Sequence, residues 1–203
     1  MTDLGFTHRF VPATAERAPL LLLHGTGGDE EDLLPLGHEI APGAALLSPR
    51  GKVLENGMPR FFRRRGEGVF DVEDMKARTD ELAVFISAAQ TAYRIGKPIA
   101  VGFSNGANIA WSLLLRHPDV LAGAVLMRAM MPFRPDVLGT LEQVPVLLLS
   151  GSADPMSPAP QREELAATLR SAGAAVTQEV VPAGHGLTQQ DLALAARWLE
   201  NQR

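Results

Sequence analysis

Apolar runs of strand length alternate with amphipathic segments of helical length along the whole chain. Short continuous apolar runs predict buried strands, whereas apolar positions that recur every three or four residues predict helices packed by one face. Their alternation predicts an α/β fold with a mostly parallel central sheet and helices on both faces. The predicted strands are Thr7–Val11 at an edge, Leu20–Leu23, Ala44–Leu47, Ile99–Phe103, Val120–Met127, Pro145–Leu149 and Ala175–Val181.

The segments between these strands predict helices. The segment Val72–Tyr93 has an apolar stripe at helical spacing, and Thr188 with Asp191 three residues later predicts a capped start for the last helix. The other predicted helices are Asp29–Ile40, Asn105–Arg116 and Pro160–Ser171. No repeat, low-complexity tract or linker divides the chain, so we expect a single domain over residues 1–203.

Composition narrows the function classes. The 203 residues are enough for a real core, and a net charge of −4 provides no general attraction to nucleic acid or anionic lipid. Without cysteine there is no disulfide, no thiolate metal site and no cysteine nucleophile. The polar start has no apolar core of a secretory signal, and the apolar runs are too short to span a bilayer. We expect a cytoplasmic, soluble protein without membrane insertion.

A serine between glycines stands where a predicted strand ends and a predicted helix begins, in Gly102-Phe103-Ser104-Asn105-Gly106. This context is typical of the nucleophile elbow of α/β-hydrolases. The sharp turn forces the serine into an unusual backbone conformation, for which the glycines leave room. The positive end of the helix favours negative charge at the serine. We therefore predict Ser104 as a nucleophile, against the alternative of an ordinary glycine-rich turn.

The base that activates Ser104 should be a histidine, which in this architecture follows the serine and the acid along the chain. Only His117 and His185 follow Ser104. His117 ends the helix that Ser104 begins, and at about 1.5 Å per residue it would lie roughly 20 Å away, too far for proton transfer. His185 follows the last predicted strand, in Ala183-Gly184-His185-Gly186, and is the predicted base.

The acid must lie between Ser104 and His185. Asp119 fails for the same reason as His117. Asp154 stands in a tight turn directly after a strand, at the edge of the sheet where Ser104 lies, and is favoured. Asp136, several residues beyond another strand, stays the rival. The acid would hold His185 in the correct tautomer and stabilise its imidazolium.

An oxyanion hole needs two backbone donors. We predict the amides of Asn105, next to the nucleophile, and of Thr26, in the loop His24-Gly25-Thr26-Gly27-Gly28 after a strand. That loop lacks the Gly-Lys-Ser/Thr ending of a phosphate-binding P-loop, and His24 is expected to brace it. Proton transfer and oxyanion binding suffice for the chemistry, so no metal or organic cofactor is implied.

The polar stretch Pro49–Phe70 is the only segment that could partly cover the site. Within it Phe61, Phe62 and Arg63 are candidate pocket residues. Its arginines either form a solvated basic loop or bind an acidic group of the substrate, and the sequence leaves both open. These arginines are Arg60, Arg63, Arg64 and Arg65.

A second candidate pocket wall follows the strand that ends at Met127. Met130 and Met131 are its candidate pocket residues, with Phe133 beside them. They either belong to the core or line an adaptable acyl pocket, because methionine fits irregular apolar ligands.

Several motifs, in this order along the chain, resemble those of the phospholipase/carboxylesterase family, which includes the acyl-protein thioesterases. They are Leu22–Asp29, Gly102–Gly106, Ser152-Ala153-Asp154-Pro155 and Gly184-His185, and three more look like the bacterial hydroquinone-induced hydrolase subgroup: Phe61–Arg64, Gly68–Asp71 and Arg128–Pro132. The resemblance spans nearly the whole chain and implies an α/β-hydrolase fold with no cap domain and activity on short acyl esters. Asn105 replaces the glutamine of the eukaryotic thioesterases, which weighs against protein depalmitoylation.

Three functions are compatible with these residues. The leading hypothesis is a serine carboxylesterase that hydrolyses small to medium carboxylic esters through an acyl-enzyme. The alternatives are a thioesterase or lysophospholipase with the same triad, and a non-catalytic relative that binds a small molecule. Dienelactone hydrolysis is disfavoured, because the related enzymes attack with cysteine. The expected partner is a small-molecule ester, and the sequence leaves a homodimer open.

Overall fold

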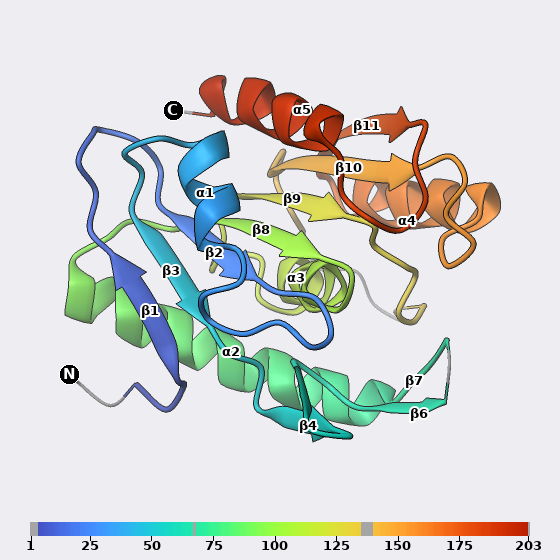
Figure 1. Cartoon of the computed structure of the whole chain (residues 1–203), viewed down its shortest axis with the longest axis horizontal. Coiled ribbons are helices and arrows are strands. Elements are labelled where there is room, and N and C mark those ends of the chain that lie inside the picture. Colours follow the sequence, from blue (N-terminus) through green and yellow to red (C-terminus); the bar gives the residue numbers. More distant parts are fainter. Residues whose placement is uncertain (1–3, 67, 135–139, 203) are drawn as a thin grey trace.

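The computed structural model describes residues 4–66, 68–134 and 140–202. Within them, seven strands form a central sheet in the order β1-β3-β2-β8-β9-β10-β11, in which β1 alone runs antiparallel to its neighbour (Figure 1). The strands of this sheet are β1 (His8–Val11), β2 (Leu20–Leu23), β3 (Leu46–Pro49), β8 (Ile99–Phe103), β9 (Gly123–Met127), β10 (Pro145–Gly151) and β11 (Ala175–Val181). The helices are α1 (Leu34–Ile40), α2 (Val72–Tyr93), α3 (Asn105–Arg116), α4 (Ala159–Ser171) and α5 (Gln189–Glu200).

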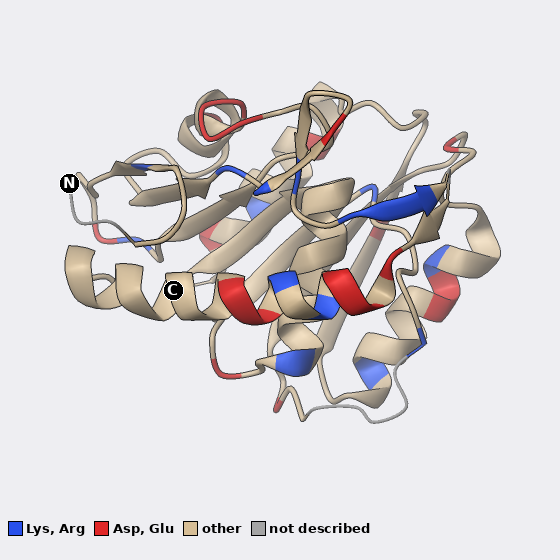
Figure 2. Ribbon diagram, turned by 90° about the horizontal axis from the view of Figure 1, so that it is seen from below, with Lys and Arg blue, Asp and Glu red and all other residues tan. Residues whose placement is uncertain are grey.

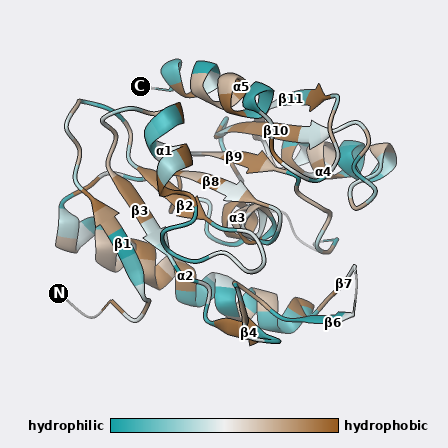
Figure 3. Ribbon diagram, viewed as in Figure 1, coloured by the Kyte–Doolittle hydropathy of each residue, from teal (hydrophilic) through white to brown (hydrophobic). Residues whose placement is uncertain are grey.

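Alternate residues of the buried strands point to opposite faces of the sheet. On β2, Leu21 and Leu23 pack in the core cluster that includes α2, α3 and α4. Leu20 and Leu22 pack in the second cluster, with α1 and α5. Both faces are therefore covered, which confirms the predicted layers. In Figure 3 the central strands are largely apolar, whereas α2, α4 and α5 carry both polar and apolar residues.

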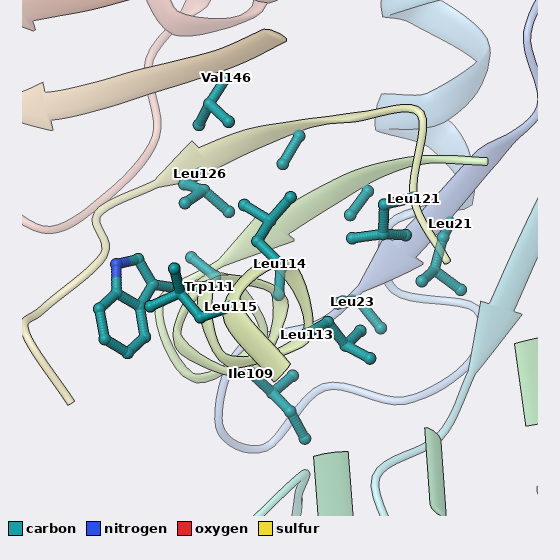
Figure 4. Packing of buried hydrophobic residues seen from close by; sticks show 14 of the residues in the cluster. Leu21, Leu23, Ile109, Trp111, Leu113, Leu114, Leu115, Leu121, Leu126 and Val146 are labelled. Atoms are coloured by element: carbon teal, nitrogen blue, oxygen red, sulfur yellow. The ribbon is translucent and has the colours of Figure 1, made fainter. Parts of the chain in front are cut away.

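Helix α3 lies at the centre of the larger cluster, between the sheet and α2 (Figure 4). Its residues 105–115 are all buried, and Trp111, Leu113 and Leu114 have no exposed surface. A helix buried on every side cannot slide without breaking contacts all around it. The residue at its start is therefore held in a fixed place.

Several predicted boundaries are wrong in detail. The first helix begins at Leu34 instead of Asp29, because the Asp29 side chain accepts a hydrogen bond from the Glu31 amide in a turn and Pro35 suits only a helix start. Strand β3 covers Leu46–Pro49 instead of Ala44–Leu47, since it pairs with β1 in that register. Strand β9 begins at Gly123, after a turn in which the Val120 amide bonds to the His117 carbonyl.

The stretch Pro49–Phe70, for which no internal element is predicted, contains two small hairpins. They are β4 (Val53–Glu55) with β5 (Met58–Arg60), and β6 (Arg64–Gly66) with β7 (Val69–Phe70). Both lie beyond the sheet, near the start of α2 (Figure 1). No separate cap domain is present among the described residues, as the sequence predicts.

The connections from β2 and β8 diverge at the centre of the sheet. The chain leaves β2 through α1 toward β3, and leaves the adjacent β8 through α3 toward β9 on the other side. In open parallel sheets the crevice at such a divergence is where ligands bind. The loops after β2 and β8 are therefore the first place to seek a site.

Charged residues are absent from the central strands of the sheet. Strands β8, β9 and β10 carry no charged residue, and the acidic and basic residues stand on helices, loops and outer strands (Figure 2). Among the described residues, no helix is both long and apolar enough to cross a membrane.

The buried state of α3 predicts a large mutational effect. We expect Leu114→Ala, at a fully buried position, to lower the free energy of unfolding by about 2–5 kcal/mol, because it leaves a cavity in the core. The matched change Val84→Ala, on α2 at a position that is 71% exposed, should shift it by no more than about 0.5 kcal/mol. Urea unfolding of both variants measures the difference, and equal effects would contradict this account of the core.

Candidate active site

Ser104 lies in a strained turn between β8 and α3. Its φ of 51° and ψ of −111° fall outside the regions that side-chain-bearing residues prefer. Its amide donates to the Met127 carbonyl at 2.9 Å, which ties the turn to the end of β9. A Cβ on Gly106 would lie 1.9 Å from the Leu23 carbonyl oxygen, so only glycine allows the helix start to approach β2 this closely.

The predicted triad residues form one hydrogen-bonded chain. Nε2 of His185 lies 2.9 Å from Oγ of Ser104, and Nδ1 lies 2.8 Å from Oδ2 of Asp154. The three side chains come from the loops after β8, β10 and β11, at the carboxyl edge of the sheet. Because an ionised carboxylate only accepts, Nδ1 carries the proton and Nε2 is free to accept one from the serine.

Burial differs along this chain of hydrogen bonds. The Asp154 side chain has no exposed surface, and its Oδ1 accepts a hydrogen bond from the Met156 amide at 2.9 Å. The His185 side chain is 26% exposed, so the hydrogen-bonded chain leads from the interior to an accessible imidazole. The ring of Phe103 lies 5.5 Å from the imidazole, centroid to centroid, and supports one side of it.

His117 and Asp119, which the sequence argument excluded, contact other residues. His117 contacts Asp80 of α2, with Nε2 2.7 Å from Oδ1. Asp119 is almost fully exposed and lies 3.9 Å from the Lys97 ammonium. Asp136, the rival acid, lies outside the described residues, so its position relative to His185 stays open.

The loop after β2 lies against the nucleophile turn. A Cβ on Gly25 would lie 2.8 Å from the ring of Phe103, so the backbone approaches Ser104 where a side chain would block it. Within the described part of the chain, no hydrogen-bond acceptor is paired with the amide of Thr26 or that of Asn105. Both predicted oxyanion donors are free to bind an external oxygen.

His24 braces this loop, as expected. It is 1% exposed; its Nδ1 donates to the Gly25 carbonyl at 2.7 Å, and its Nε2 accepts from the Gly51 amide at 3.0 Å. This pair of bonds defines a neutral imidazole. Burial lowers the pKa of His24, which keeps it uncharged.

The predicted pocket residues occupy different environments. Phe61 and Phe62 are 2% and 0% exposed and pack in the larger core cluster, whereas the side chain of Arg63 is 61% exposed. Met130 is 8% exposed and Met131 is partly buried. A pocket role for these residues stays a prediction.

Two asparagines tie these segments to α3. Oδ1 of Asn105 accepts from the Phe61 amide at 2.8 Å, and Oδ1 of Asn108 accepts from the Met130 amide at 2.9 Å. Sequence reasoning assigned a role to the Asn105 backbone and missed both side chains. Their spacing of three residues, which places them on one helical face, was the available signal.

Each arginine of the hairpin region already has a carboxylate partner. Arg60 and Arg64 contact Glu55 at 3.3 and 2.7 Å, and Arg63 and Arg65 contact Asp71 at 3.5 and 3.4 Å. The Arg60 side chain is 3% exposed and is not solvated, whereas those of Arg63 and Arg65 are 61% and 68% exposed. Since all four arginines are already paired with carboxylates, these contacts favour a basic loop over a site for an acidic group of the substrate.

Other candidate sites lack this chemistry. A hollow of about 860 Å³ lies near the starts of β2 and β8 and the end of α5, at the opposite edge of the sheet from the triad. Within the described residues, no group of three or more His, Asp or Glu side chains is arranged to hold a metal ion.

The mostly parallel sheet, the helices on both faces and the serine turn after β8 define the α/β-hydrolase fold. The chain belongs to the phospholipase/carboxylesterase family, whose model matches residues 10–202, and this confirms the family expected from the motifs.

The chain is similar to relatives along nearly its full length. It is 48% identical, over 193 residues, to MhqD of Bacillus subtilis (strain 168), which bears the name of a hydrolase; the match covers 94% of this chain and 96% of MhqD. The crystal structure of the Bacillus cereus carboxylesterase matches with a TM-score of 0.94 and 43% identity, covering 98% of this chain and 95% of that one. A carboxylesterase from Mesorhizobium loti matches with a TM-score of 0.91 and 33% identity, covering 99% of this chain and 97% of that one.

The buried state of His24 predicts a dependence of stability on pH. The pKa of His24 is lowered in the folded chain and returns to about 6.5 on unfolding, so the unfolded chain takes up the proton first as the pH falls. Stability from this group is complete above about pH 6.5 and is lost progressively below it, toward the lowered folded pKa.

We therefore expect the urea midpoint to fall more between about pH 7.5 and about pH 5.5 in the wild type than in His24→Gln, which keeps a donor and an acceptor but does not titrate. The other histidines are present in both proteins and cancel in the comparison. An equal fall of the urea midpoint in the two proteins would show that His24 is not held neutral.

Proposed function

We propose that this chain is a serine carboxylesterase in which Ser104 is the nucleophile, His185 the general base and acid, and Asp154 the residue that orients His185. The observation that carries the proposal is the hydrogen-bonded chain from Ser104 Oγ through both nitrogens of His185 to the buried Asp154. Membership of the phospholipase/carboxylesterase family and the similarity to two carboxylesterases support an ester as the substrate.

The proposed reaction has two half-reactions. Nε2 of His185 accepts the proton of Ser104 as Oγ attacks the ester carbonyl carbon, and the tetrahedral intermediate then expels the alcohol, which takes the proton from Nε2. Water repeats the sequence on the acyl-enzyme and frees the carboxylic acid. Asp154 stays ionised throughout and stabilises the imidazolium.

The free amides of Thr26 and Asn105 are the proposed oxyanion donors. The Asn105 amide stands at the positive end of α3, where its dipole and that of the helix both favour a negative oxygen. These donors act only when charge develops on the carbonyl oxygen, so they lower the barrier instead of merely tightening substrate binding.

A longer acyl chain is the second candidate, favoured by exposed apolar residues beside the site. Met58 is 40% exposed and Leu54 69% exposed, both on the β4–β5 hairpin. The Gly27 amide donates to the Pro59 carbonyl at 3.0 Å, which holds this hairpin against the predicted oxyanion loop. An acyl tail that leaves the site along this hairpin would bury apolar surface on it.

Removal of the nucleophile tests the proposal. We expect Ser104→Ala to lose labelling by a fluorophosphonate probe and to lower kcat for a p-nitrophenyl ester by roughly four to six orders of magnitude. Ser87→Ala, a serine on α2 bonded to the Ala83 carbonyl, is the matched control and should keep both. Ester hydrolysis at wild-type speed in Ser104→Ala would overturn the assignment.

Acyl specificity separates the two candidate substrates. For small to medium esters we expect kcat/KM, measured with acetyl, butyryl, octanoyl and palmitoyl esters of one alcohol, to peak before the palmitoyl ester. In that case Met58→Ser and the control Val84→Ser should leave the profile unchanged, because the short-ester proposal places no part of the acyl group on the hairpin. A maximum at the palmitoyl ester that Met58→Ser lowers would replace the short-ester proposal with the long-chain one.

A further inference from the structure

Arg128 is fully buried, although an arginine is always charged. It follows β9 directly, with a φ of 56°, and its guanidinium meets Asp191 at the start of α5 through two hydrogen bonds of 2.8 Å each. Both side chains of this pair have no exposed surface. Such pairs contribute little net stability, because desolvation offsets their attraction. Stability alone therefore gives no reason for its presence.

Two further hydrogen bonds of the Arg128 guanidinium go to the loop that carries His185, and a third, of 3.3 Å, goes to the Leu149 carbonyl of β10. Nε donates to the Gly184 carbonyl at 2.9 Å, and an Nη donates to the Gly186 carbonyl at 3.0 Å. These carbonyls belong to the residues directly before and after His185. A planar guanidinium with fixed donor directions thus holds the backbone on both sides of the imidazole.

Asp191 fixes the far end of the His185 loop, at Thr188. Its Oδ2 accepts from the amide and the hydroxyl of Thr188, each at 2.8 Å, within the capping box that begins α5. The loop 184–188 is therefore fixed at one end by Arg128 directly and at the other by Asp191, which Arg128 orients.

The backbone around Arg128 also contacts the loops of the other two triad residues. The carbonyl before it, on Met127, accepts from the Ser104 amide at 2.9 Å. The carbonyl after it, on Ala129, accepts from the Ser157 hydroxyl at 2.9 Å, in the turn that begins at Asp154. One short segment thus contacts the loops of the serine, the acid and the histidine.

We propose that Arg128 is a positioning residue that sets the placement of the His185 imidazole relative to Ser104, through the Gly184 and Gly186 carbonyls and through Asp191. The effect of this placement on ester hydrolysis rests on the proposed function. Arg128 touches no reacting atom, so its loss should slow the chemistry without changing ester binding.

The decisive variant replaces the whole buried pair by apolar residues, in Arg128→Met/Asp191→Leu. Because apolar replacement of a buried ion pair commonly preserves folding, this protein should stay folded. We expect kcat for a p-nitrophenyl ester to fall on the order of 100-fold, as expected for a misplacement of about 1 Å, with KM within about twofold of the wild type. Arg128→Lys keeps the charge but not the planar fork, and should also lower kcat.

Leu199→Ala is the matched control, since Leu199 is buried on the same helix as Asp191 but lies near the end of α5 that is farther from the His185 loop. It should lower the thermal midpoint and leave kcat unchanged. The Nδ1 proton of His185, observed as a downfield resonance by NMR, should move or broaden in both Arg128 variants and not in Leu199→Ala.

Two outcomes would overturn the inference: a folded double variant with wild-type kcat and an unmoved resonance, or an equal loss of kcat in Leu199→Ala. The NMR measurement needs no turnover. A wild type that hydrolyses no ester would therefore refute the proposed function while the positioning by Arg128 is still tested.

Discussion

The close approach of Gly106 to the Leu23 carbonyl is the contact on which the site depends. It brings the start of a helix that is buried over residues 105–115 against the end of a central strand, and it leaves Ser104 with a positive φ between them. Such a conformation costs on the order of 1–3 kcal/mol and persists only where the surroundings fix it. Here the buried length of α3 and the Met127 carbonyl fix it. The turn between β8 and α3 therefore holds the Ser104 hydroxyl within hydrogen-bonding distance of His185.

The order of strands then brings the other groups to the same place. The chain diverges between β2 and β8, so the loop with Gly25 and the turn with Ser104 open side by side at one edge of the sheet. Since β10 and β11 run parallel to β8, their following loops open at that edge as well and carry Asp154 and His185. Buried polar side chains hold these loops in place through hydrogen bonds to their backbone. Asn105 and Asn108 hold the neighbouring segments, and Arg128 holds the histidine loop.

The hydrophobic pattern predicted the layers, the covered faces and the positions of the central strands, because buried parallel strands are continuous apolar runs. The length of the predicted helix after Ser104 excluded His117, which left His185 as the predicted base. Hydrogen bonds join Ser104, His185 and the favoured acid Asp154 in the structure. The early start assigned to α1 failed because a local aspartate turn competes with the helix at Asp29. The two hairpins of Pro49–Phe70 were missed because their strands are too short to show a period.

Contacts between distant polar residues were beyond the sequence argument. Nothing in the neighbours of Arg128 indicates that its partner stands on the last helix, and an arginine is normally read as exposed. Phe61 and Phe62 stand in a polar stretch of the sequence but are buried in the larger core cluster, and their predicted pocket role stays a prediction. In both cases the deciding fact is tertiary burial, which no local pattern records.

A rapid-quench experiment with a p-nitrophenyl ester tests most directly that Ser104 is an acyl-forming nucleophile. With deacylation slowed at low pH, p-nitrophenol should appear in a burst equal to the concentration of the chain. Mass spectrometry of the quenched protein should then find one acyl group on the peptide that contains Ser104. Hydrolysis without a burst and without an acyl group, or an acyl group on another residue, would contradict the account.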